Sequence, residues 1–430
     1  MSRTRDTTVS CVDGGGPAGP PESESDPAPE PLRSVVVVGA SLAGLRAAEA
    51  LRARGFTGTL SIVGDEPHLP YDRPPLSKQV LTSDVRPEAT ELPRPEGLSA
   101  DWLLGRPATG LDLETRTVTL EDGAGLPYDG LVIATGSAAR GWPASRPAPP
   151  AGVVTLRGRD DALALRAAME PGRRLVVVGA GFLGGEIAAA ARHRGLDVTL
   201  VEAESQPLRR AIGAGVGAYI AALHREAGID LRTGTTVTGF DTTSDGRLGG
   251  VRLSDGSSLA SGLAVLALGA VPATGWLAGS GLALEGGVHC DPYLRVLRAD
   301  GSVVPNVVAA GDIARVPQRL ADGERLALGH WTNAVEQAAA AAANLLAPRT
   351  PEVFAGVPSF WSDLYGARIR SVGLPAAADE ARILEHDLPG RRLEVSYHRA
   401  GRLVGALTVG RTARLGAYRS ALQEAGAVAA

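Results

Sequence analysis

The sequence predicts an α/β fold with two Rossmann-like domains and a C-terminal α+β domain. A chain of 430 residues is long enough for two or three domains of ordinary size. A β-branched strand that runs into a glycine-rich turn and a helix occurs twice, and the first glycines of the two copies, Gly39 and Gly179, lie 140 residues apart. Residues 351–430 instead carry short strand patterns and one closing helix. Strands that alternate with helices are typical of parallel sheets.

The composition suits an α/β protein with many tight turns, since apolar residues make up 44% of the chain and glycine occurs 55 times. Residues 1–32 are rich in Gly, Pro, Ser and acidic residues, and they account for the whole formal charge of −4. We therefore expect residues 1–32 to form a disordered tail. The rest of the chain is neutral overall, so we expect no binding to nucleic acid or to an anionic membrane.

Neither a membrane span nor a secretion signal is expected. No apolar run reaches the roughly 18 residues that cross a bilayer. The first residues also lack the charged-then-apolar pattern of a signal peptide. The two cysteines, Cys11 and Cys290, lie 279 residues apart, which excludes a CxxC redox pair. We expect a cytoplasmic protein.

The first glycine-rich turn lies in a complete strand–turn–helix–strand unit. The unit consists of a buried strand at 34–38, the turn Gly39-Ala40-Ser41-Leu42-Ala43-Gly44, a helix from 45 to about 54 and a second strand at 59–63. An acidic pair, Asp65 and Glu66, follows that strand. In a dinucleotide fingerprint the glycines let the backbone approach a pyrophosphate, and an acid accepts a ribose hydroxyl. Ser41 replaces the middle glycine, which weakens this copy of the pattern.

The second copy is a full G-x-G-x-x-G pattern. It consists of a strand at 175–178, the turn Gly179-Ala180-Gly181-Phe182-Leu183-Gly184, a helix to about 194 and a strand at 197–201. Glu202 follows 23 residues after Gly179, close to the separation expected of a ribose-binding acid. A carboxylate there would repel the 2′-phosphate of NADPH, so NADH is favoured. Arg209 and Arg210 are near enough in sequence to bind that phosphate instead.

Three further strands are predicted to lead into small residues. They are 131–137, with Ala134, Thr135 and Gly136, then 264–269, which ends at Gly269, and 306–313, with Gly311 and Asp312. Ligands of open α/β sheets bind at the carboxyl ends of strands, so Asp312 is placed to hold a cofactor hydroxyl. A helix N-cap is the alternative role for Asp312.

A single lysine, Lys78, stands among 42 arginines and closes the run Pro70-Tyr71-Asp72-Arg73-Pro74-Pro75-Leu76-Ser77-Lys78. A lysine in so arginine-rich a chain indicates a site that needs a compact point charge and not a planar fork. Glu186 lies two residues past Gly184, in the first turns of the second helix, where it could face the crevice between the domains. Burial would make both charges costly unless they pair. The alternatives are a plain surface turn for Lys78 and a carboxylate near a helix N-terminus for Glu186.

The last third of the chain adds aromatic residues next to a helix. His330-Trp331-Thr332-Asn333 precedes an alanine-rich helix to about 346, whose N-terminus could face an electron-rich ring. Phe360-Trp361-Ser362-Asp363 then opens the predicted α+β domain. Its expected elements are strands at 369–373, 393–397 and 403–409 and a helix from about 412 to 424.

Taken together, these motifs resemble those of the flavin-dependent ferredoxin reductases that use a nicotinamide donor, a family akin to apoptosis-inducing factor. The resemblance spans residues 34 to about 425 and rests on PYDRPPLSK (70–78), LVIATGS (131–137), GAGFLGGE (179–186), VVAAGDIAR (307–315), HWTNAVEQA (330–338) and FWSD (360–363). It implies a glutathione-reductase-like arrangement. The implied domains are an FAD-binding domain of 33–150 and 275–349, an NAD-binding domain of 151–274 and a C-terminal domain of 350–430.

The resemblance also implies roles for matching residues. The FAD site would include Gly39, Ala40, Gly44, Asp65 or Glu66, and Arg73, with Asp312 at the ribityl chain and Trp331 and Trp361 near the isoalloxazine. The NAD site would include Gly179, Gly181, Gly184 and Glu202. Further cofactor-binding residues are expected at Ser41, Pro74, Ala134, Thr135, Gly136, Phe182, Leu183, Gly269 and Gly311. Lys78 would lie beside the flavin as a catalytic residue, paired with Glu186.

The implied activity is hydride transfer from NADH to FAD and then single-electron transfer to a [2Fe–2S] ferredoxin or rubredoxin that feeds a cytochrome P450 or oxygenase. Lys78 would stabilise anionic reduced flavin. No metal is expected, and we expect a monomer or a weak homodimer.

Other functions of the same fold stay open. Disulfide, peroxide and coenzyme A disulfide reductases pass electrons through a cysteine at the flavin, but Cys290 is distant from both flavin turns in the motif order. A redox-sensing flavoprotein with an interaction role is a second alternative. A different NAD(P)H-dependent flavin reductase without a redox cysteine is the third.

Overall fold

The first predicted strand lies inside a six-stranded sheet. The computed structural model describes residues 31–83 and 85–427, so nearly all of the predicted tail lies outside the described residues. The strands, in spatial order, are β19 (Arg295–Leu297), β20 (Val303–Ala309), β7 (Gly130–Ile133), β1 (Ser34–Val38), β2 (Thr59–Val63) and β3 (Asp101–Leu103). All neighbours are parallel except β19 and β20. Residues 35–38 are almost fully buried, as expected of a central parallel strand.

The second glycine-rich unit builds a five-stranded parallel sheet. Its strands, in spatial order, are β12 (Asp230–Arg232), β11 (Asp197–Val201), β10 (Arg174–Val178), β16 (Leu263–Leu266) and β9 (Val153–Val154). In the first sheet, β1 precedes the glycine turn and lies between β2, which precedes the acidic residues, and β7, which leads into small residues. In the second sheet, β10 lies in the same way between β11 and β16. Three carboxyl ends therefore meet at one edge of each sheet, where ligands of open α/β sheets bind.

The three strands predicted to lead into small residues do so. β7, β16 and β20 end at residues 133, 266 and 309, and the small residues that follow them lie in turns. These turns leave the sheet because glycines such as Gly136, Gly269 and Gly311 have positive φ, which other residues rarely adopt.

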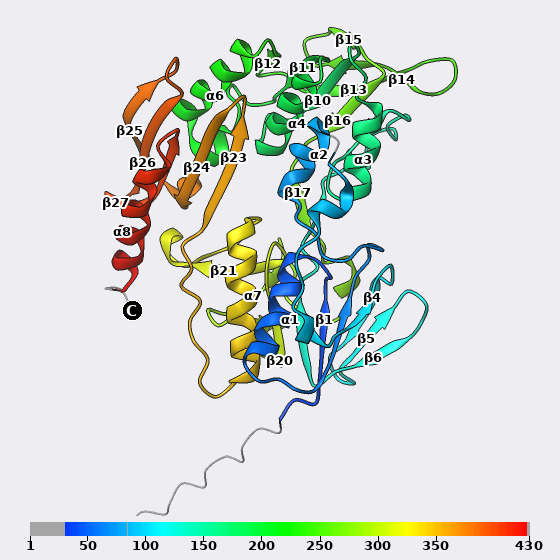
Figure 1. Ribbon diagram of the computed structural model, residues 1–430, viewed down its shortest axis with the longest axis vertical. Coiled ribbons are helices and arrows are strands. Elements are labelled where there is room, and N and C mark those ends of the chain that lie inside the picture. Colours follow the sequence, from blue (N-terminus) through cyan, green and yellow to red (C-terminus); the bar gives the residue numbers. More distant parts are fainter. Residues whose placement is uncertain (1–30, 84, 428–430) are drawn as a thin grey trace, which may run out of the picture. The chain divides into compact units, whose positions relative to one another are not determined.

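Helices pack against these sheets and connect them (Figure 1). They are α1 (Leu42–Ala53), α2 (Gln79–Thr82), α3 (Arg159–Ala168), α4 (Phe182–His193), α5 (Arg209–Ile212), α6 (Ala214–Glu226), α7 (Trp331–Leu346) and α8 (Leu415–Ala427). α1 begins at Leu42, three residues before the predicted start, because the end of the glycine turn is already helical. α1 and α7 lie side by side against the first sheet, and their buried alanines let them approach closely.

The C-terminal domain contains a five-stranded antiparallel sheet. Its strands, in spatial order, are β23 (Ser359–Leu364), β24 (Ala367–Gly373), β27 (Arg402–Val409), β26 (Arg392–Arg399) and β25 (Glu380–Asp387). The prediction of three strands is therefore incomplete, since β23 and β25 are additional. β25 is mostly exposed, so its sequence lacks the apolar alternation of a half-buried strand. α8 begins at Leu415 and not near 412, because a 3₁₀ turn precedes it.

Smaller sheets complete the fold. They are β4 (Ala108–Asp112) with β5 (Thr117–Leu120) and β6 (Gly125–Pro127), β13 (Val237–Thr242) with β14 (Leu248–Leu253) and β15 (Ser258–Ala260), β18 (Val288–His289) with β21 (Ala314–Gln318) and β22 (Glu324–Ala327), and the pair β8 (Ser137–Ala139) and β17 (Ala270–Pro272). β8 and β17 pair the segments that follow β7 and β16, which links the two parallel sheets. The described residues from Leu32 to Ala427 form one compact unit, and the proposed domain boundaries stay a prediction.

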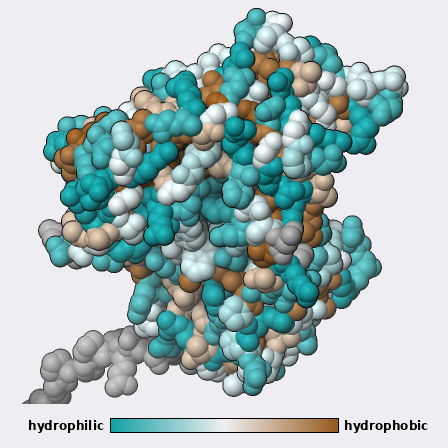
Figure 2. Space-filling model, turned by 45° about the horizontal axis from the view of Figure 1, so that its top comes forward, coloured by the Kyte–Doolittle hydropathy of each residue, from teal (hydrophilic) through white to brown (hydrophobic). Residues whose placement is uncertain are grey.

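The face of the protein in Figure 2 is largely hydrophilic, with hydrophobic residues scattered among polar ones. Within the described residues, the exposed large hydrophobic side chains are Leu183, Val303, Val353, Ile383 and Leu384. No helix in that part of the chain has the length and apolar character needed to cross a bilayer.

A buried histidine joins α6 to the C-terminal sheet. His224 is 1% exposed, and its Nδ1 lies 2.7 Å from the hydroxyl of Tyr365 in the turn between β23 and β24. Burial lowers the pKa of His224 to about 4. The histidine is therefore neutral in the folded protein at neutral pH.

We expect the free energy of unfolding to fall as the pH drops from about 6.5 to about 4, and His224 to contribute about 3 kcal/mol of that fall, because the unfolded chain binds a proton that folded His224 excludes. Denaturant unfolding near pH 7 and near pH 4 measures this fall, which should be smaller in His224→Asn. His193→Asn, at an exposed histidine on α4, is the matched control and should keep the wild-type dependence. An unchanged dependence in His224→Asn would contradict this assignment.

Candidate active site

Three adjoining cavities follow the carboxyl ends of the strands in the two parallel sheets. The first-fingerprint cavity is lined by residues 38–41 and 63–66, among others. The central cavity, of about 350 Å³, is lined by Lys78, Asp312 and Trp361, among others. The second-fingerprint cavity, of about 680 Å³, is lined by residues 181–184 and 201–203, among others. The central cavity shares lining residues with each of the other two, so the three adjoin one another.

Close backbone packing explains the first and last glycine of each fingerprint. A Cβ on Gly39 would lie 2.1 Å from a carbonyl oxygen in the segment after β7, and one on Gly44 would lie 1.8 Å from the carbonyl oxygen of Gly39. The second turn repeats this packing. A Cβ on Gly179 would lie 2.4 Å from a carbonyl oxygen after β16, and one on Gly184 would lie 1.9 Å from the oxygen of Gly179. Only glycine fits these four positions without a shift of the backbone.

The middle position of the fingerprint has no such constraint. A Cβ on Gly181 would meet no heavy atom within 4 Å, and Ser41 has a φ of −110°, which any residue adopts. Both residues are the N-cap of the following helix and line a cavity. Serine at position 41 therefore leaves the turn intact.

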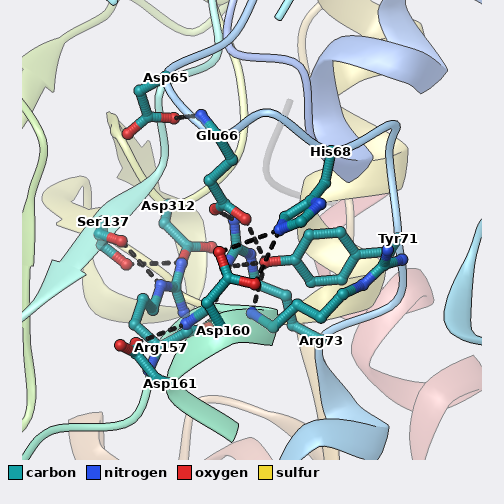
Figure 3. Close-up of polar contacts among 12 residues, drawn as sticks. Asp65, Glu66, His68, Tyr71, Arg73, Ser137, Arg157, Asp160, Asp161 and Asp312 are labelled. Carbon is teal, nitrogen blue, oxygen red and sulfur yellow. Dashed lines mark hydrogen bonds and ion pairs between the residues drawn. The ribbon is translucent and has the colours of Figure 1, made fainter. Parts of the chain in front are cut away.

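An acid, a phenol and a guanidinium meet where the first-fingerprint cavity adjoins the central cavity (Figure 3). The Tyr71 hydroxyl donates to Glu66 and accepts from Arg73 Nη1 at 3.1 Å. Arg73 also forms an ion pair with Glu66 at 2.5 Å. Burial acts to raise the pKa of Glu66, but Arg73 and Tyr71 outweigh it and lower the pKa. Of the two predicted ribose acids, Glu66 is thus bound to Arg73, while Asp65 accepts the backbone N–H of Glu66 at 3.0 Å.

A second polar group surrounds Asp312 at the end of β20 (Figure 3). Its Oδ2 accepts from Ser137 Oγ at 2.8 Å and from Arg157 Nη2 at 3.0 Å. Arg157 Nε also donates to the carbonyl of Ser137 at 2.7 Å. The N-cap alternative for Asp312 is wrong, because strand β21 and not a helix follows. Asp312 therefore faces the central cavity with its carboxylate held by two partners.

Lys78 and Glu186 lie in contact at the wall of the central cavity. Lys78 Nζ lies 2.8 Å from Glu186 Oε2 and donates to the carbonyl of Pro74 at 3.2 Å. Glu186 is 7% exposed, and the hydroxyls of Ser77 and Ser362 each donate to its carboxylate at 2.6 Å. The 3₁₀ turn Pro74–Ser77, whose prolines fix φ, carries Lys78 to this point. The ammonium is therefore held at the cavity by a buried acid.

Aromatic side chains form one wall of the central cavity. The ring of Trp331, at the start of α7, lies 6.0 Å from that of Trp361 on β23. Phe182, at the start of α4, lies 4.8 Å from the ring of Phe360. Burial lowers the pKa of His330, which also lines the cavity. This wall is therefore apolar and suited to a planar aromatic ring.

Glu202 is fixed by two backbone donors at the end of β11. Its Oε2 accepts from the N–H of Ala180 at 2.8 Å, and its Oε1 accepts from the N–H of Glu204 at 2.9 Å. Arg210, an alternative phosphate ligand, pairs with Glu204. Among the described residues, neither Arg209 nor Arg210 lines the second-fingerprint cavity. The arrangement favours a ribose hydroxyl over a phosphate at this position.

The residues predicted to bind cofactors line these cavities, with Gly44 packed beneath the first turn. The first-fingerprint cavity includes Gly39, Ala40, Asp65 and Glu66. The central cavity includes Ser41, Arg73, Pro74, Lys78, Ala134, Thr135, Gly136, Phe182, Leu183, Glu186, Gly311, Asp312, Trp331 and Trp361. The second-fingerprint cavity includes Gly179, Gly181, Gly184, Glu202 and Gly269.

Several residues of the site have no role in the sequence-based prediction. Ser77 and Ser362 lie inside two recognised motifs, but their contacts with Glu186 depend on how distant segments pack. Arg157 and Trp142 lie in a segment without a recognisable motif. Trp142 lines the second-fingerprint cavity beside Arg146, whose guanidinium lies 5.1 Å from the tryptophan ring.

Cys290 does not belong to this site. It is fully buried, and burial raises the pKa of its thiol, which opposes formation of a reactive thiolate. In the described part of the chain, no cysteine lines any of the three cavities. Cys11 lies outside the described residues.

Known proteins are similar to this chain in sequence and in fold. Rhodocoxin reductase of Rhodococcus erythropolis is 38% identical over 350 residues, which cover 80% of this chain and 79% of that protein. Putidaredoxin reductase of Pseudomonas putida is 34% identical over 386 residues, which cover 88% of this chain and 89% of that protein. The structure of the covalent putidaredoxin reductase–putidaredoxin complex matches with a TM-score of 0.84 and 31% identity, covering 91% of this chain and 93% of that one.

Two family models match separate parts of the chain, one with the parallel sheets and one with the C-terminal antiparallel sheet. Residues 33–338 match the family described as pyridine nucleotide-disulphide oxidoreductase, and residues 359–430 match the reductase C-terminal family. The first range contains both fingerprints, and the second contains the antiparallel sheet. The chain therefore belongs to the pyridine nucleotide-disulphide oxidoreductase family and ends in a domain of the reductase C-terminal family.

Proposed function

We propose that this chain is an FAD-dependent reductase that oxidises NADH and passes electrons one at a time to a [2Fe–2S] ferredoxin or a rubredoxin. The observation that carries the proposal is the wall shared by two dinucleotide cavities. Phe182 and Leu183, at the N-terminus of α4, line both the central and the second-fingerprint cavity. Direct transfer between two dinucleotides requires such a meeting point.

The residues present fit both dinucleotides. Each glycine turn forms a cradle at the N-terminus of α1 or α4, where its middle residue, Ser41 or Gly181, lines a cavity and backbone N–H groups favour a pyrophosphate. The central cavity adds an aromatic wall and a lysine to the first cradle. FAD, when bound, would supply the chemistry that links a hydride donor to a one-electron acceptor.

In this proposal the chain's own residues hold and orient the cofactors. Arg73 and the neighbouring acids would bind the adenosine half of FAD, and Asp312 would accept a ribityl hydroxyl. Trp331 and Trp361 would border the ring. Glu202 would accept a ribose hydroxyl of NADH, because its carboxylate is already fixed by two backbone donors.

Lys78 would supply positive charge at the ring. An ammonium has three N–H donors. Within the described residues, the Lys78 ammonium contacts Glu186 and the carbonyl of Pro74. One donor is therefore left for a group in the central cavity, where it would stabilise negative charge that develops on reduction.

The electron acceptor is inferred from the relatives. They include the ferredoxin reductase component of a chlorobenzene dioxygenase from a Cupriavidus species, 39% identical over 345 residues. A downstream cytochrome P450 or oxygenase is part of the proposal on the same ground. The cytoplasmic location and the monomer or weak homodimer stay predictions.

Reduction of cytochrome c by NADH, with a panel of [2Fe–2S] ferredoxins and rubredoxins, tests the function. We expect reduction that depends on the added iron–sulfur protein, with kcat/KM for NADH at least about tenfold above that for NADPH, because Glu202 repels a 2′-phosphate. Fast reduction of a one-electron dye by NADH would also separate a reductase from a redox-sensing flavoprotein. A preference for NADPH, or no turnover with any acceptor, would contradict the proposal.

A further inference from the structure

We propose that Ser362 of the C-terminal domain is a positioning residue for the reduction of FAD by NADH, acting on Lys78 through Glu186. This inference rests on the function proposed above and deepens it. Ser362 lies on β23 and is fully buried. It does not belong to the described residues that line the cavities, so it acts through its neighbour.

The carboxylate of Glu186 has a donor on each oxygen. Ser362 Oγ donates to Oε1 at 2.6 Å. Ser77 Oγ at 2.6 Å and Lys78 Nζ at 2.8 Å contact Oε2. The last torsion of a glutamate side chain is broad, so donors on one oxygen alone leave the carboxylate plane free to turn. The hydroxyl of Ser362 sets that plane and, with it, the position of the oxygen that holds the ammonium.

The four groups come from three parts of the fold. Ser77 and Lys78 follow the first parallel sheet's β2, Glu186 lies on α4 of the second sheet, and Ser362 belongs to the C-terminal sheet. The hydrogen bond between Ser362 and Glu186 therefore forms only because β23 packs against α4. The C-terminal domain thus supplies a polar contact to the junction of the two dinucleotide cavities.

The packing of β23 on α4 is specific. A Cβ on Gly185, next to Glu186, would lie 3.3 Å from His224 and 3.4 Å from the side chain of Leu364 at the end of β23. The turn after Leu364 has positive φ at Tyr365 and Gly366, 51° and 80°, as in a tight type I′ hairpin. The hydroxyl of Tyr365 is bound to His224 Nδ1 at 2.7 Å. These contacts hold Ser362 at a fixed place relative to the carboxylate.

Loss of the Ser362 hydroxyl would leave a buried carboxylate oxygen without its donor, which is costly. The carboxylate can recover a donor by turning toward Ser77 or Lys78, and that turn moves the ammonium away from its place at the cavity. We therefore expect Ser362→Ala to keep FAD bound but to slow flavin reduction by NADH about tenfold. Ser362→Thr keeps the hydroxyl and should restore the rate to within about twofold of wild type.

The single lysine of the chain gives a readout that does not depend on turnover. In the holoenzyme labelled with lysine that carries ¹⁵N in its side chain, the Nζ signal belongs to Lys78 alone. In Ser362→Ala we expect this signal to shift and its N–H protons to exchange with water at least about fivefold faster. Ser362→Thr should return both properties to the wild-type values.

Ser371→Ala is the matched control. Ser371 is 1% exposed on the neighbouring strand β24, and its hydroxyl donates to the carbonyl of Ala406 at 3.0 Å, away from Glu186. This variant should keep the wild-type Nζ signal and rate. A wild-type signal and rate in Ser362→Ala would overturn the inference, as would an equal effect of Ser371→Ala. Failure of the wild-type protein to reduce any ferredoxin would refute the proposed function and leave the Nζ comparison intact.

Discussion

Arginine in place of Lys78 is expected to slow the reduction of bound flavin by NADH about 100-fold, equivalent to about 2.7 kcal/mol of activation free energy. The positive charge is kept, but a planar fork replaces a compact ammonium. The Lys78 ammonium lies 2.8 Å from Glu186 and 3.2 Å from the carbonyl of Pro74, and the lysine side chain is 17% exposed. A guanidinium there must displace Ser77 from the carboxylate or turn out of the cavity. Stopped-flow absorbance of the flavin measures the rate.

Gln79→Arg provides the matched control for this change. Gln79 is the next residue, is exposed and lies outside the residues that line the cavities. The Gln79→Arg variant introduces a guanidinium nearby without touching Glu186, so the rate of flavin reduction should stay at the wild-type value. Both variants should retain FAD, as read from their absorbance spectra. An unchanged rate in Lys78→Arg would return Lys78 to the status of an ordinary turn residue.

The fingerprint turns could be predicted from the sequence because backbone geometry dictates them locally. At Gly44 and Gly184 a side chain would collide with the carbonyl of the first glycine in the same turn. The strands before them are equally evident, since a β-branched run such as 35–38 has no polar face and must be buried. These two local requirements fix both parallel sheets, and with them the edge where the cavities lie.

No local feature of the sequence dictates the polar contacts around Glu186. Ser77 and Ser362 are 109 and 176 residues from Glu186 in sequence, and a serine is equally common on a solvated surface. Only the packing of β23 on α4 brings them together. Lys78 could be identified because it is unique in the composition, which is an accident of an arginine-rich chain. Its partner could be inferred only from the expected fold.

The edge strand β25 shows why the C-terminal sheet could be predicted only in part. β26 buries the alternating apolar residues Leu393, Val395 and Tyr397, and β27 buries a mostly apolar stretch at 404–409, so their patterns are strong. β25 lies at the edge of the sheet and is mostly exposed, with Ile383 and Leu384 47% and 58% exposed. Its strand conformation comes from pairing with β26 and not from burial of a face.

Two matched substitutions in the fingerprint turns are expected to separate the cofactor sites. In Gly44→Ala the new Cβ would lie 1.8 Å from the carbonyl oxygen of Gly39, and in Gly184→Ala it would lie 1.9 Å from that of Gly179. Relief of either clash needs a backbone shift that costs about 3 kcal/mol or more. Gly44→Ala should lose FAD during purification. Gly184→Ala should keep FAD but need at least about 100-fold more NADH for half-maximal flavin reduction.

Gly416→Ala serves as the control for both, because it adds the same methyl group to an exposed position on α8, where a Cβ meets no heavy atom within 4 Å. Its FAD content and NADH dependence should match wild type. Loss of FAD in Gly184→Ala would mean that the two turns are not independent sites. Ser41 already shows that these turns do not require glycine throughout, since a side chain is accommodated at the middle position. What the turns require is space at the first and last glycines, and the two alanine variants measure that requirement at the last glycine for one cofactor at a time.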